Sequence, residues 1–270
     1  MERNATFPTG RVGSIAATVA ADIAEKLNER SGLGDDLPLV AEDVTQWVLE
    51  DGFADGRPAL EKAGVQFVDD VTDYEHVKIR MLNAGHIMLC FPAILEGCEF
   101  VDQAIADKDL RGNLENFLNK DVIPTLQAPP GISLEGYRDS VISRFSNPAM
   151  ADQTLRIASD GCSKIQVFWT ETMRRAIENK RDMTRLVFGI ASYLEMLRGK
   201  DQNGKAYEPI EPVYGDAERK LAKADDFESA LKLPAFDSWR DLQTPELTNA
   251  IIAARKLIRE KGVKAALPAS

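Results

Sequence analysis

The chain has 270 residues, a formal net charge of −10 and a sequence pI of about 4.9. Hydrophobic residues make up 44% of it, which is enough for a sizeable core. Because no basic run is interleaved with aromatic residues, nucleic acids and anionic membranes are not expected partners. The three cysteines form no Cys-x-x-Cys pair, and the N-terminus lacks an apolar signal core. Both features are typical of a cytoplasmic protein.

The first seventy residues are predicted to hold one helix and a small β element. Residues 14–31 carry an Ala- and Ile-rich helical pattern that ends at Gly32. The segments with strand character are Val40–Phe53 and Val65–Val68, and the turn residues between them predict a small ribbon of two or three strands. The stretch Gly10-Arg-Val-Gly13 follows no strand pattern and is interpreted as a loop.

From residue 70 onward the sequence is mostly helical, and proline and glycine divide it into segments. Pro92 is expected to kink or restart a helix, and Asn147 followed by Pro148 is typical of a helix start. Helices are predicted at residues 74–91, 100–106, 110–123, 134–145, 148–159, 165–178, 184–197 and 244–261. The fold class is therefore mainly α. We expect a single domain over residues 1–270, with 7–69 as a connecting segment and 70–270 as the helical core.

The predicted helix over residues 74–91 carries polar side chains that its surroundings make costly. At about 100° per residue, Lys78, Asn83 and His86 fit on one side of the helix, and apolar residues fill nearly every other direction. A desolvated ammonium must find partners or lose its proton. Beside hydrogen-bonding groups, such a lysine is suited to act as a general base near neutral pH. The residues alone leave open that Lys78 reaches solvent and that the others are structural.

A resemblance to a known family favours the catalytic interpretation. The string Lys78-Ile-Arg-Met-Leu-Asn-Ala-Gly-His86 resembles the Lys-x-x-x-x-Asn-x-x-His signature of the polyol-specific long-chain dehydrogenases, the mannitol dehydrogenase family. The resemblance covers most of residues 7–215. It continues in Phe7-Pro-Thr-Gly, Gln46-Trp-Val-Leu-Glu-Asp, Gly64-Val-Gln-Phe-Val-Asp-Asp, Pro129-Pro-Gly-Ile, Arg144-Phe-Ser-Asn-Pro-Ala, Asp152-Gln-Thr-Leu-Arg-Ile-Ala and Tyr193-Leu-Glu-Met-Leu-Arg-Gly.

The resemblance implies an all-α C-terminal domain and oxidation of a secondary alcohol of mannitol, arabinitol or a similar polyol. Hydride would pass to NAD without a metal. Lys78 would be the acid/base, Asn83 would donate to the developing alkoxide, and His86 would bond the same or the neighbouring hydroxyl. Arg156 would contact substrate, although it also has the spacing for an ion pair with Asp152 one turn earlier.

Two departures from the family stand out. Members carry a dinucleotide-binding domain before the Phe-Pro stretch, but Met1 lies only six residues before Phe7, and no Gly-x-Gly-x-x-Gly turn follows a strand pattern. We therefore expect the substrate-binding half of an enzyme without its Rossmann domain, inactive alone and with a separate Rossmann chain as a candidate partner. In addition, Val12-Gly13-Ser14 stands where the family has Val-Asp-Arg, so substrate preference or activity is expected to differ.

Two alternatives remain open. A hexuronate (fructuronate-type) reductase of the same family would need an extra cation near Lys78. The nearest candidate, Arg80, lies about 200° around the helix and points away, which favours an uncharged polyol. A helical module without catalysis could instead bind a sugar alcohol or a partner protein.

The proton and metal chemistry of the helix can also be anticipated. The two histidines, His76 and His86, have no metal-ligand spacing, so no metal site is expected. Burial should lower the pKa of Lys78, whereas Glu75 should raise it, and we expect burial to dominate.

Overall fold

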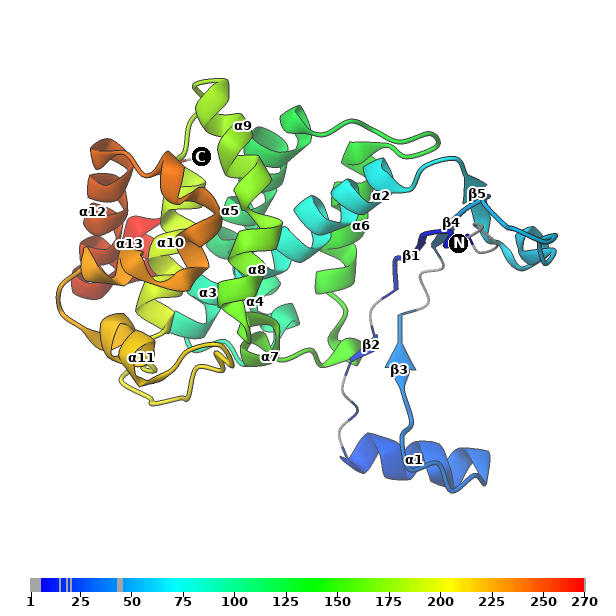
Figure 1. The fold of residues 1–270 in the computed structure, drawn as a ribbon. Coiled ribbons are helices and arrows are strands. Elements are labelled where there is room, and N and C mark those ends of the chain that lie inside the picture. The colour runs from blue at the N-terminus through cyan, green and yellow to red at the C-terminus, as the bar shows by residue number, and fades with distance from the viewer. Residues whose placement is uncertain (1–5, 15, 18, 20, 43–45, 270) are drawn as a thin grey trace.

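The computed structural model describes residues 6–14, 16, 17, 19, 21–42 and 46–269. Helices pack into one body, and the described residues before residue 70 extend from one side of it (Figure 1). The α-helices of the body are α2 (Thr72–Val77), α3 (Ala84–Leu95), α4 (Val101–Ala106), α5 (Lys108–Asn116), α6 (Leu134–Phe145), α7 (Thr154–Ala158), α8 (Gly161–Phe168), α9 (Thr170–Glu178), α10 (Thr184–Met196), α11 (Asp216–Lys223), α12 (Pro245–Lys261) and α13 (Val263–Ala266).

Helices of other pitch join these elements. Two segments are π-helical, η2 (Lys78–Asn83) and η3 (Phe117–Val122). The 3-10 helices are η1 (Leu60–Ala63), η4 (Ile123–Thr125), η5 (Pro148–Met150), η6 (Ser229–Lys232) and η7 (Pro234–Leu242). The mainly α fold class predicted from the sequence is confirmed.

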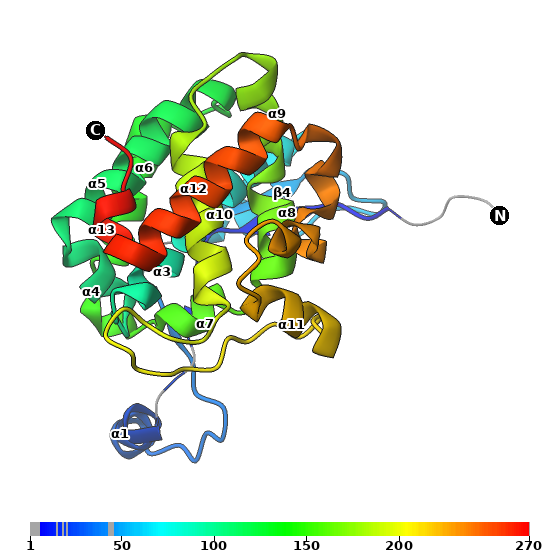
Figure 2. The same ribbon diagram turned by 90° about the vertical axis from the view of Figure 1, so that its left-hand side faces the viewer.

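The core is built around two helices that solvent barely reaches. Every residue of α3 is buried, as is every residue of α10 after Thr184. The two helices pack against each other, and α12 crosses α10 on its outer side (Figure 2). A Cβ atom at Gly189 of α10 would lie 2.7 Å from Trp169 and 3.0 Å from Met88. Glycine at this position therefore allows α3 and α10 to approach closely.

The N-terminal segment forms two small sheets and a projecting arm. Strands β1 (Gly10–Val12), β4 (Trp47–Glu50) and β5 (Gln66–Val68) make a sheet in the order β1-β4-β5, with β1 antiparallel and β5 parallel to β4. Strands β2 (Ala16–Ala17) and β3 (Val40–Ala41) pair antiparallel and lead to α1 (Ala21–Ser31).

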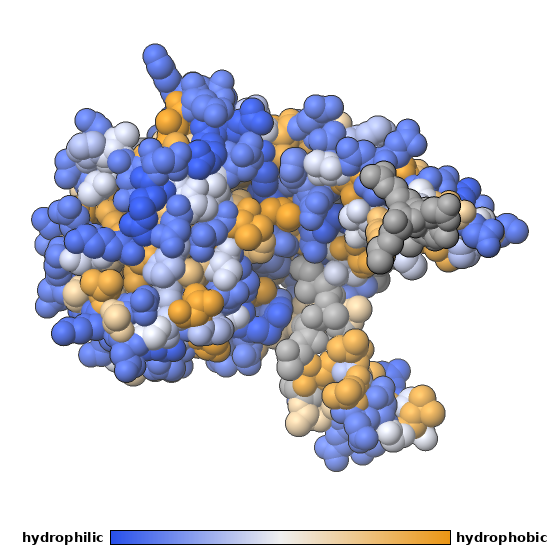
Figure 3. Space-filling model, viewed as in Figure 1, coloured by the Kyte–Doolittle hydropathy of each residue, from blue (hydrophilic) through white to orange (hydrophobic). Residues whose placement is uncertain are grey.

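Helix α1 lies at the tip of this arm, away from the helical body, and none of its residues is buried (Figures 1 and 2). Figure 3 shows hydrophobic side chains on the surface of the arm. The exposed ones include Leu33, Leu37 and Leu39, in the loop after α1.

Several predicted boundaries in the N-terminal segment are wrong. The predicted helix over residues 14–31 begins only at Ala21, because Ala16–Ala17 pairs with β3 instead. Gly10–Val12 is a strand and not a loop, since it pairs with β4 nearly forty residues later in the chain. Both differences come from strand pairing at long range, which local patterns do not reveal.

Two predicted helices of the body are interrupted, and a third continues past the break expected at Pro92. The helix predicted over residues 148–159 is a 3-10 turn, a residue with φ of 44° at Ala151, and then α7. The predicted helix over 165–178 breaks at Trp169, between α8 and α9. Pro92 does not end its helix, because α3 continues through it to Leu95.

Among the described residues, no helix is both long enough and apolar enough to cross a membrane.

Candidate active site

The predicted helix over residues 74–91 is present, but its centre is a π-turn. Helix α2 continues without a break into η2 and then α3. The Ala84 N–H donates to the Ile79 carbonyl, five residues back, where an α-helix would use the residue four back. One extra residue in the turn rotates everything after it by about 100° relative to a uniform α-helix. The uniform rotation of about 100° per residue expected for this segment is therefore wrong between Lys78 and Asn83.

Lys78 is the first residue of the π-turn and is half-buried. Burial lowers the pKa of its ammonium, and the nearby charges of Arg11 and Arg144 lower it further. Glu42 and Glu75 act in the opposite direction but do not prevail. The lowered pKa of Lys78 agrees with the expectation that burial outweighs the charge of Glu75. No carboxylate among the described residues lies within ion-pair distance of the Lys78 ammonium.

His86 lies inside the helical body, on α3. Its side chain stacks on Phe145 of α6, with ring centroids 3.9 Å apart and an angle of 19° between the planes. Burial, together with Arg144, Arg156 and other cations, lowers the pKa of His86 well below its ordinary value. The imidazole is therefore neutral near pH 7, with one nitrogen as donor and the other as acceptor.

Asn83 is the last residue of the π-turn and is half-buried, three residues before His86. Its amide is therefore not enclosed by the core as His86 is. The π-turn thus begins with Lys78, ends with Asn83 and leads directly into the turn of α3 that carries His86.

Arg156 lies on α7, which packs against α3. Its guanidinium forms a two-point ion pair with Asp152, with N–O distances of 2.7 and 2.6 Å. The ion pair between Arg156 and Asp152 that their spacing suggested is therefore present. The side chain remains 37% exposed, and its charge lowers the pKa of His86, so Arg156 does belong to the surroundings of the site.

Two further cations near His86 were not singled out from the sequence. The Arg144 side chain is only 7% exposed, pairs with Glu42 at 2.6 and 2.8 Å and donates to the Gly13 carbonyl at 2.9 Å. Lys164 of α8 donates to the Ile157 carbonyl at 2.8 Å. The partners of Arg144 are more than 100 residues away, so no local pattern identifies it. Lys164 could have been found, because it follows the same logic of a lysine in a partly apolar helix.

Gly13, where the sequence departs from the family, lies beside this site. Its carbonyl accepts from Arg144, and its N–H donates to the Gln46 carbonyl at 2.8 Å. A Cβ atom at Gly13 would lie 2.6 Å from Oε1 and 2.9 Å from Cβ of Gln46. An aspartate could be accommodated only if Gln46 moved.

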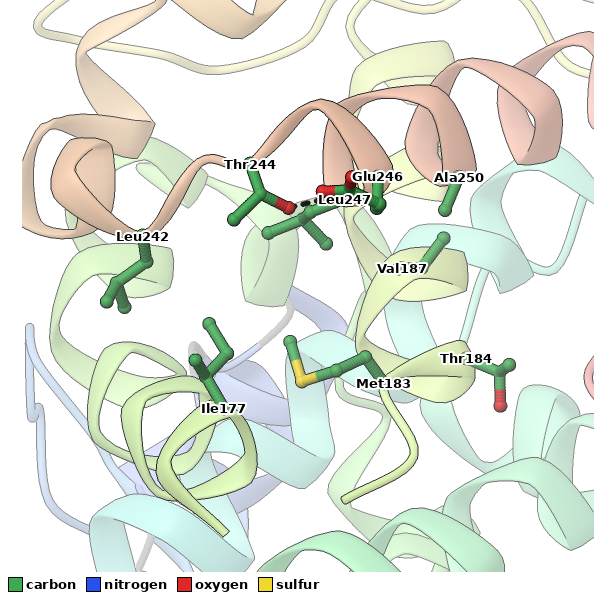
Figure 4. A pocket seen from close by; sticks show the side chains of 9 residues that line it. All are labelled: Ile177, Met183, Thr184, Val187, Leu242, Thr244, Glu246, Leu247 and Ala250. Atoms are coloured by element: carbon green, nitrogen blue, oxygen red, sulfur yellow. Dashed lines mark hydrogen bonds between the residues drawn. The ribbon is translucent and has the colours of Figure 1, made fainter. Parts of the chain in front are cut away.

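The cleft beside His86 is narrow. It has a volume of about 20 Å³, which is room for about one water molecule, and its lining includes Glu42, Arg144 and Asp152. A larger cavity of about 360 Å³ lies between α9, α10 and α12 and contains none of the site residues (Figure 4). Of the three polar residues of this helix, Lys78 and Asn83 are therefore the more accessible to solvent.

The described residues contain no cluster of three metal-binding side chains. The sequence also has no Gly-x-Gly-x-x-Gly turn, so it offers no such turn to hold the pyrophosphate of a dinucleotide.

Comparison with known proteins agrees with these features. The family model described as "Mannitol dehydrogenase C-terminal domain" matches residues 70–258. The chain belongs to this family, as its sequence motifs predicted.

The relatives are similar over the whole chain but are longer. A "Polyol:NADP oxidoreductase" of Gluconobacter oxydans is 77% identical over 100% of this chain and 56% of the relative. A crystal structure of D-sorbitol dehydrogenase in substrate-free form is 75% identical, with a TM-score of 0.92 over 99% of this chain and 55% of that one. Pseudomonas fluorescens mannitol 2-dehydrogenase, in a ternary complex with NAD and D-mannitol, is 35% identical with a TM-score of 0.88, over 97% and 54%. The chain thus spans about half the length of the relatives it matches.

Proposed function

We propose that this chain carries the substrate-binding and acid/base site of a metal-independent polyol dehydrogenase. The reaction would oxidise a secondary alcohol of mannitol, arabinitol or a similar open-chain polyol to the ketose. The observation that carries this proposal is Lys78, a half-buried lysine of lowered pKa with no carboxylate partner among the described residues. It lies beside the neutral His86 on one continuous helix.

The roles follow from the chemistry of each group. The nicotinamide, when bound, accepts the hydride from the carbinol carbon. Neutral Lys78 takes the hydroxyl proton, and in the reverse direction its ammonium returns it. The Asn83 amide donates a hydrogen bond to the oxygen as negative charge develops there. His86, held by its stack on Phe145, bonds the same or the neighbouring hydroxyl.

The surrounding charges support a reaction that builds an alkoxide. Four cations influence His86, and two of them, Arg144 and Arg156, are neutralised by Glu42 and Asp152. The other two are lysines, Lys78 and Lys164. Lys164 has no carboxylate within ion-pair distance among the described residues, and Lys78 becomes cationic when it takes the proton, so these two charges favour the alkoxide as it forms.

Three arginines around the site favour an uncharged polyol over a hexuronate, whereas Arg11, whose charge reaches Lys78 and whose buried Nη2 has no hydrogen-bond partner among the described residues, is the cation that a hexuronate would use. A substrate carboxylate needs a cation with free donors near Lys78. Arg80 is directed away, toward Thr172 of α9. Arg144 and Arg156 already hold carboxylates at two points each.

We further infer that the dinucleotide is held mainly by protein outside this chain. The relatives are longer, and their printed names mention both NADP and NAD. We therefore propose a nicotinamide dinucleotide, either NAD or NADP, as the cofactor. Arg156 is proposed to contact substrate with the exposed part of its guanidinium.

Two measurements test the proposed function. The isolated chain should give no saturable change in NADH fluorescence, because no glycine-rich turn is available for the pyrophosphate. A chimera that adds the unmatched part of the Gluconobacter relative should oxidise polyols with a nicotinamide cofactor. If the chimera bound the cofactor and a polyol but did not turn over, the chain would be a binding module and not a catalyst.

A further inference from the structure

Arg80, at the centre of the π-turn, is held away from Lys78 by neutral partners. Its side chain is only 4% exposed. Nε donates to the Thr172 hydroxyl of α9 at 3.0 Å, and Nη1 donates to the Thr125 carbonyl at 3.0 Å. Nη2 contacts the Thr125 hydroxyl, which in turn donates to the Val122 carbonyl at 2.9 Å. One guanidinium therefore ties η2 to both α9 and η4.

This arrangement is costly for a structural arginine. No carboxylate among the described residues lies within ion-pair distance of Arg80. Burial lowers the pKa of its guanidinium to about 10, although Glu171 opposes the shift. The described arginines Arg185 and Arg255, which are also buried, have carboxylate partners in Asp121 and Glu195. Arg80 differs because its guanidinium, which holds several N–H groups in a fixed plane, bonds neutral oxygen atoms on two elements at once.

The π-turn is also held at its end. The Trp169 indole N–H donates to the Ala84 carbonyl at 3.3 Å, and Trp169 is fully buried. Trp169 and Thr172 are three residues apart, at the start of α9. The α8–α9 junction thus contacts both the centre of the π-turn and the residue that follows it. π-turns are rare and occur often at functional sites, so contacts that fix one in place call for an explanation.

We propose that Arg80 is a positioning residue that maintains the π-turn and so sets the rotation of His86 relative to Lys78. If the turn relaxed to an α-helix, the residues after it would rotate by about 100° relative to Lys78, and the direction of the His86 side chain relative to Lys78 would change by that angle. This inference deepens the proposed function and rests on it. The structural part of the claim, the rotation between the two side chains, does not depend on activity.

The first test uses the two histidines as reporters. In the chain of 270 residues, Arg80→Lys keeps the charge but loses the planar set of donors. Imidazole ¹³C–¹H NMR should then show the His86 signal displaced, because its ring current from Phe145 changes, while the signal of the exposed His76 stays in place. Arg255→Lys is the matched control, since it alters another fully buried arginine outside the site. It should lower thermal stability and leave the His86 signal unchanged.

A second variant protects the test against a failure to fold. Thr172→Val removes only one acceptor of Arg80 and should displace the same signal to a smaller extent. If the His86 signal stays in place in every Arg80 and Thr172 variant that folds, while stability falls as in Arg255→Lys, then Arg80 is merely structural and the proposal is wrong.

In the chimera, Arg80→Lys should lower kcat by about 100-fold, the effect of misplacing reacting groups by about 1 Å. Cofactor affinity should not change. A displaced His86 signal with unchanged kcat would leave the rotation correct but overturn its catalytic relevance. Failure of the proposed function would be recognised separately, because Lys78→Ala would then retain turnover.

Discussion

Two charged regions of the described structure differ in how some of their cations are paired. Beneath α12, Arg255 and Arg259 share the Glu195 carboxylate at 2.9 and 2.8 Å, and Arg255 is fully buried. Around His86, the ammonium groups of Lys78 and Lys164 lack a carboxylate within ion-pair distance among the described residues, and the pKa of each is lowered.

We interpret the paired arginines as a structural cluster and the unpaired lysines as groups that can exchange protons. A paired arginine stays charged at every physiological pH and contributes fixed geometry. An unpaired, desolvated lysine costs stability but can exchange a proton near neutral pH. Substitutions in the two regions should therefore have different effects, on catalysis in one and on stability in the other.

The largest expected effect is on catalysis. Lys78→Ala should reduce polyol oxidation by the chimera by about 100- to 10,000-fold, the typical contribution of a general base. Stability should hold or rise slightly, because the costly ammonium is gone. Steady-state turnover and thermal unfolding measure the two effects, and added primary amines should restore part of the rate. Lys256→Ala, on the exposed side of α12, is the control. A Lys78→Ala rate within a few-fold of the parent would contradict the assignment.

In the paired region, the expected effect is on stability. Glu195→Gln should lower the free energy of unfolding by roughly 3 to 5 kcal/mol, because it leaves buried Arg255 without a counter-charge. Urea unfolding of the isolated chain measures this loss. Glu208→Gln disrupts an exposed pair with Arg219 and should cost no more than about 1 kcal/mol. Equal losses in the two variants would show that burial does not distinguish these pairs.

A smaller effect is expected at Glu211, a buried carboxylate that accepts from Cys162 N–H and the Tyr193 hydroxyl. Burial raises its pKa from 4.5 to about 7, and Asp160 adds to the shift. The native state therefore binds more protons than the unfolded chain between these pH values. The free energy of unfolding should fall as pH rises through that window, by up to about 3 kcal/mol. Glu211→Gln should flatten this dependence in urea unfolding curves, and an unchanged slope would locate the titration elsewhere.

The pH dependence of the rate should show the smallest effect, at most about tenfold per pH unit. Because the lowered pKa of Lys78 makes the neutral base available below the ordinary lysine value, alcohol oxidation should rise with pH and reach a plateau. Ketone reduction should fall over the same range. Initial rates in both directions, measured at saturating cofactor, report this pair of curves. Oxidation independent of pH would mean that the base lies outside this chain.

Sequence patterns predicted the helical architecture well but not its local interruptions. The helix 134–145 was predicted to the residue, since its apolar residues recur at the three- and four-residue spacing of a helix. The π-turn at Lys78–Asn83 was not predicted. It depends on contacts of Arg80 with Thr125 and Thr172, which lie 45 and 92 residues further along the chain.

The site could be predicted only in part, because some of its residues make their contacts at long range. Lys78 and His86 could be singled out because polar groups in an apolar helix are locally visible. Arg144 could not be assigned a place, because its partners Glu42 and Gly13 come from the N-terminal segment. The catalytic roles of Lys78, Asn83, His86 and Arg156 remain predictions.

The most direct measurement of the central claim is Lys78→Arg in the chimera, followed across pH. Arginine keeps the positive charge and the hydrogen-bond donors, but it does not give up its proton in this pH range. If Lys78 acts as a base, Lys78→Arg should be as inactive as Lys78→Ala, and the rise of oxidation with pH should disappear. If Lys78→Arg retained turnover with the parent pH profile, Lys78 would serve only as a cationic donor, and the account of this site would be wrong.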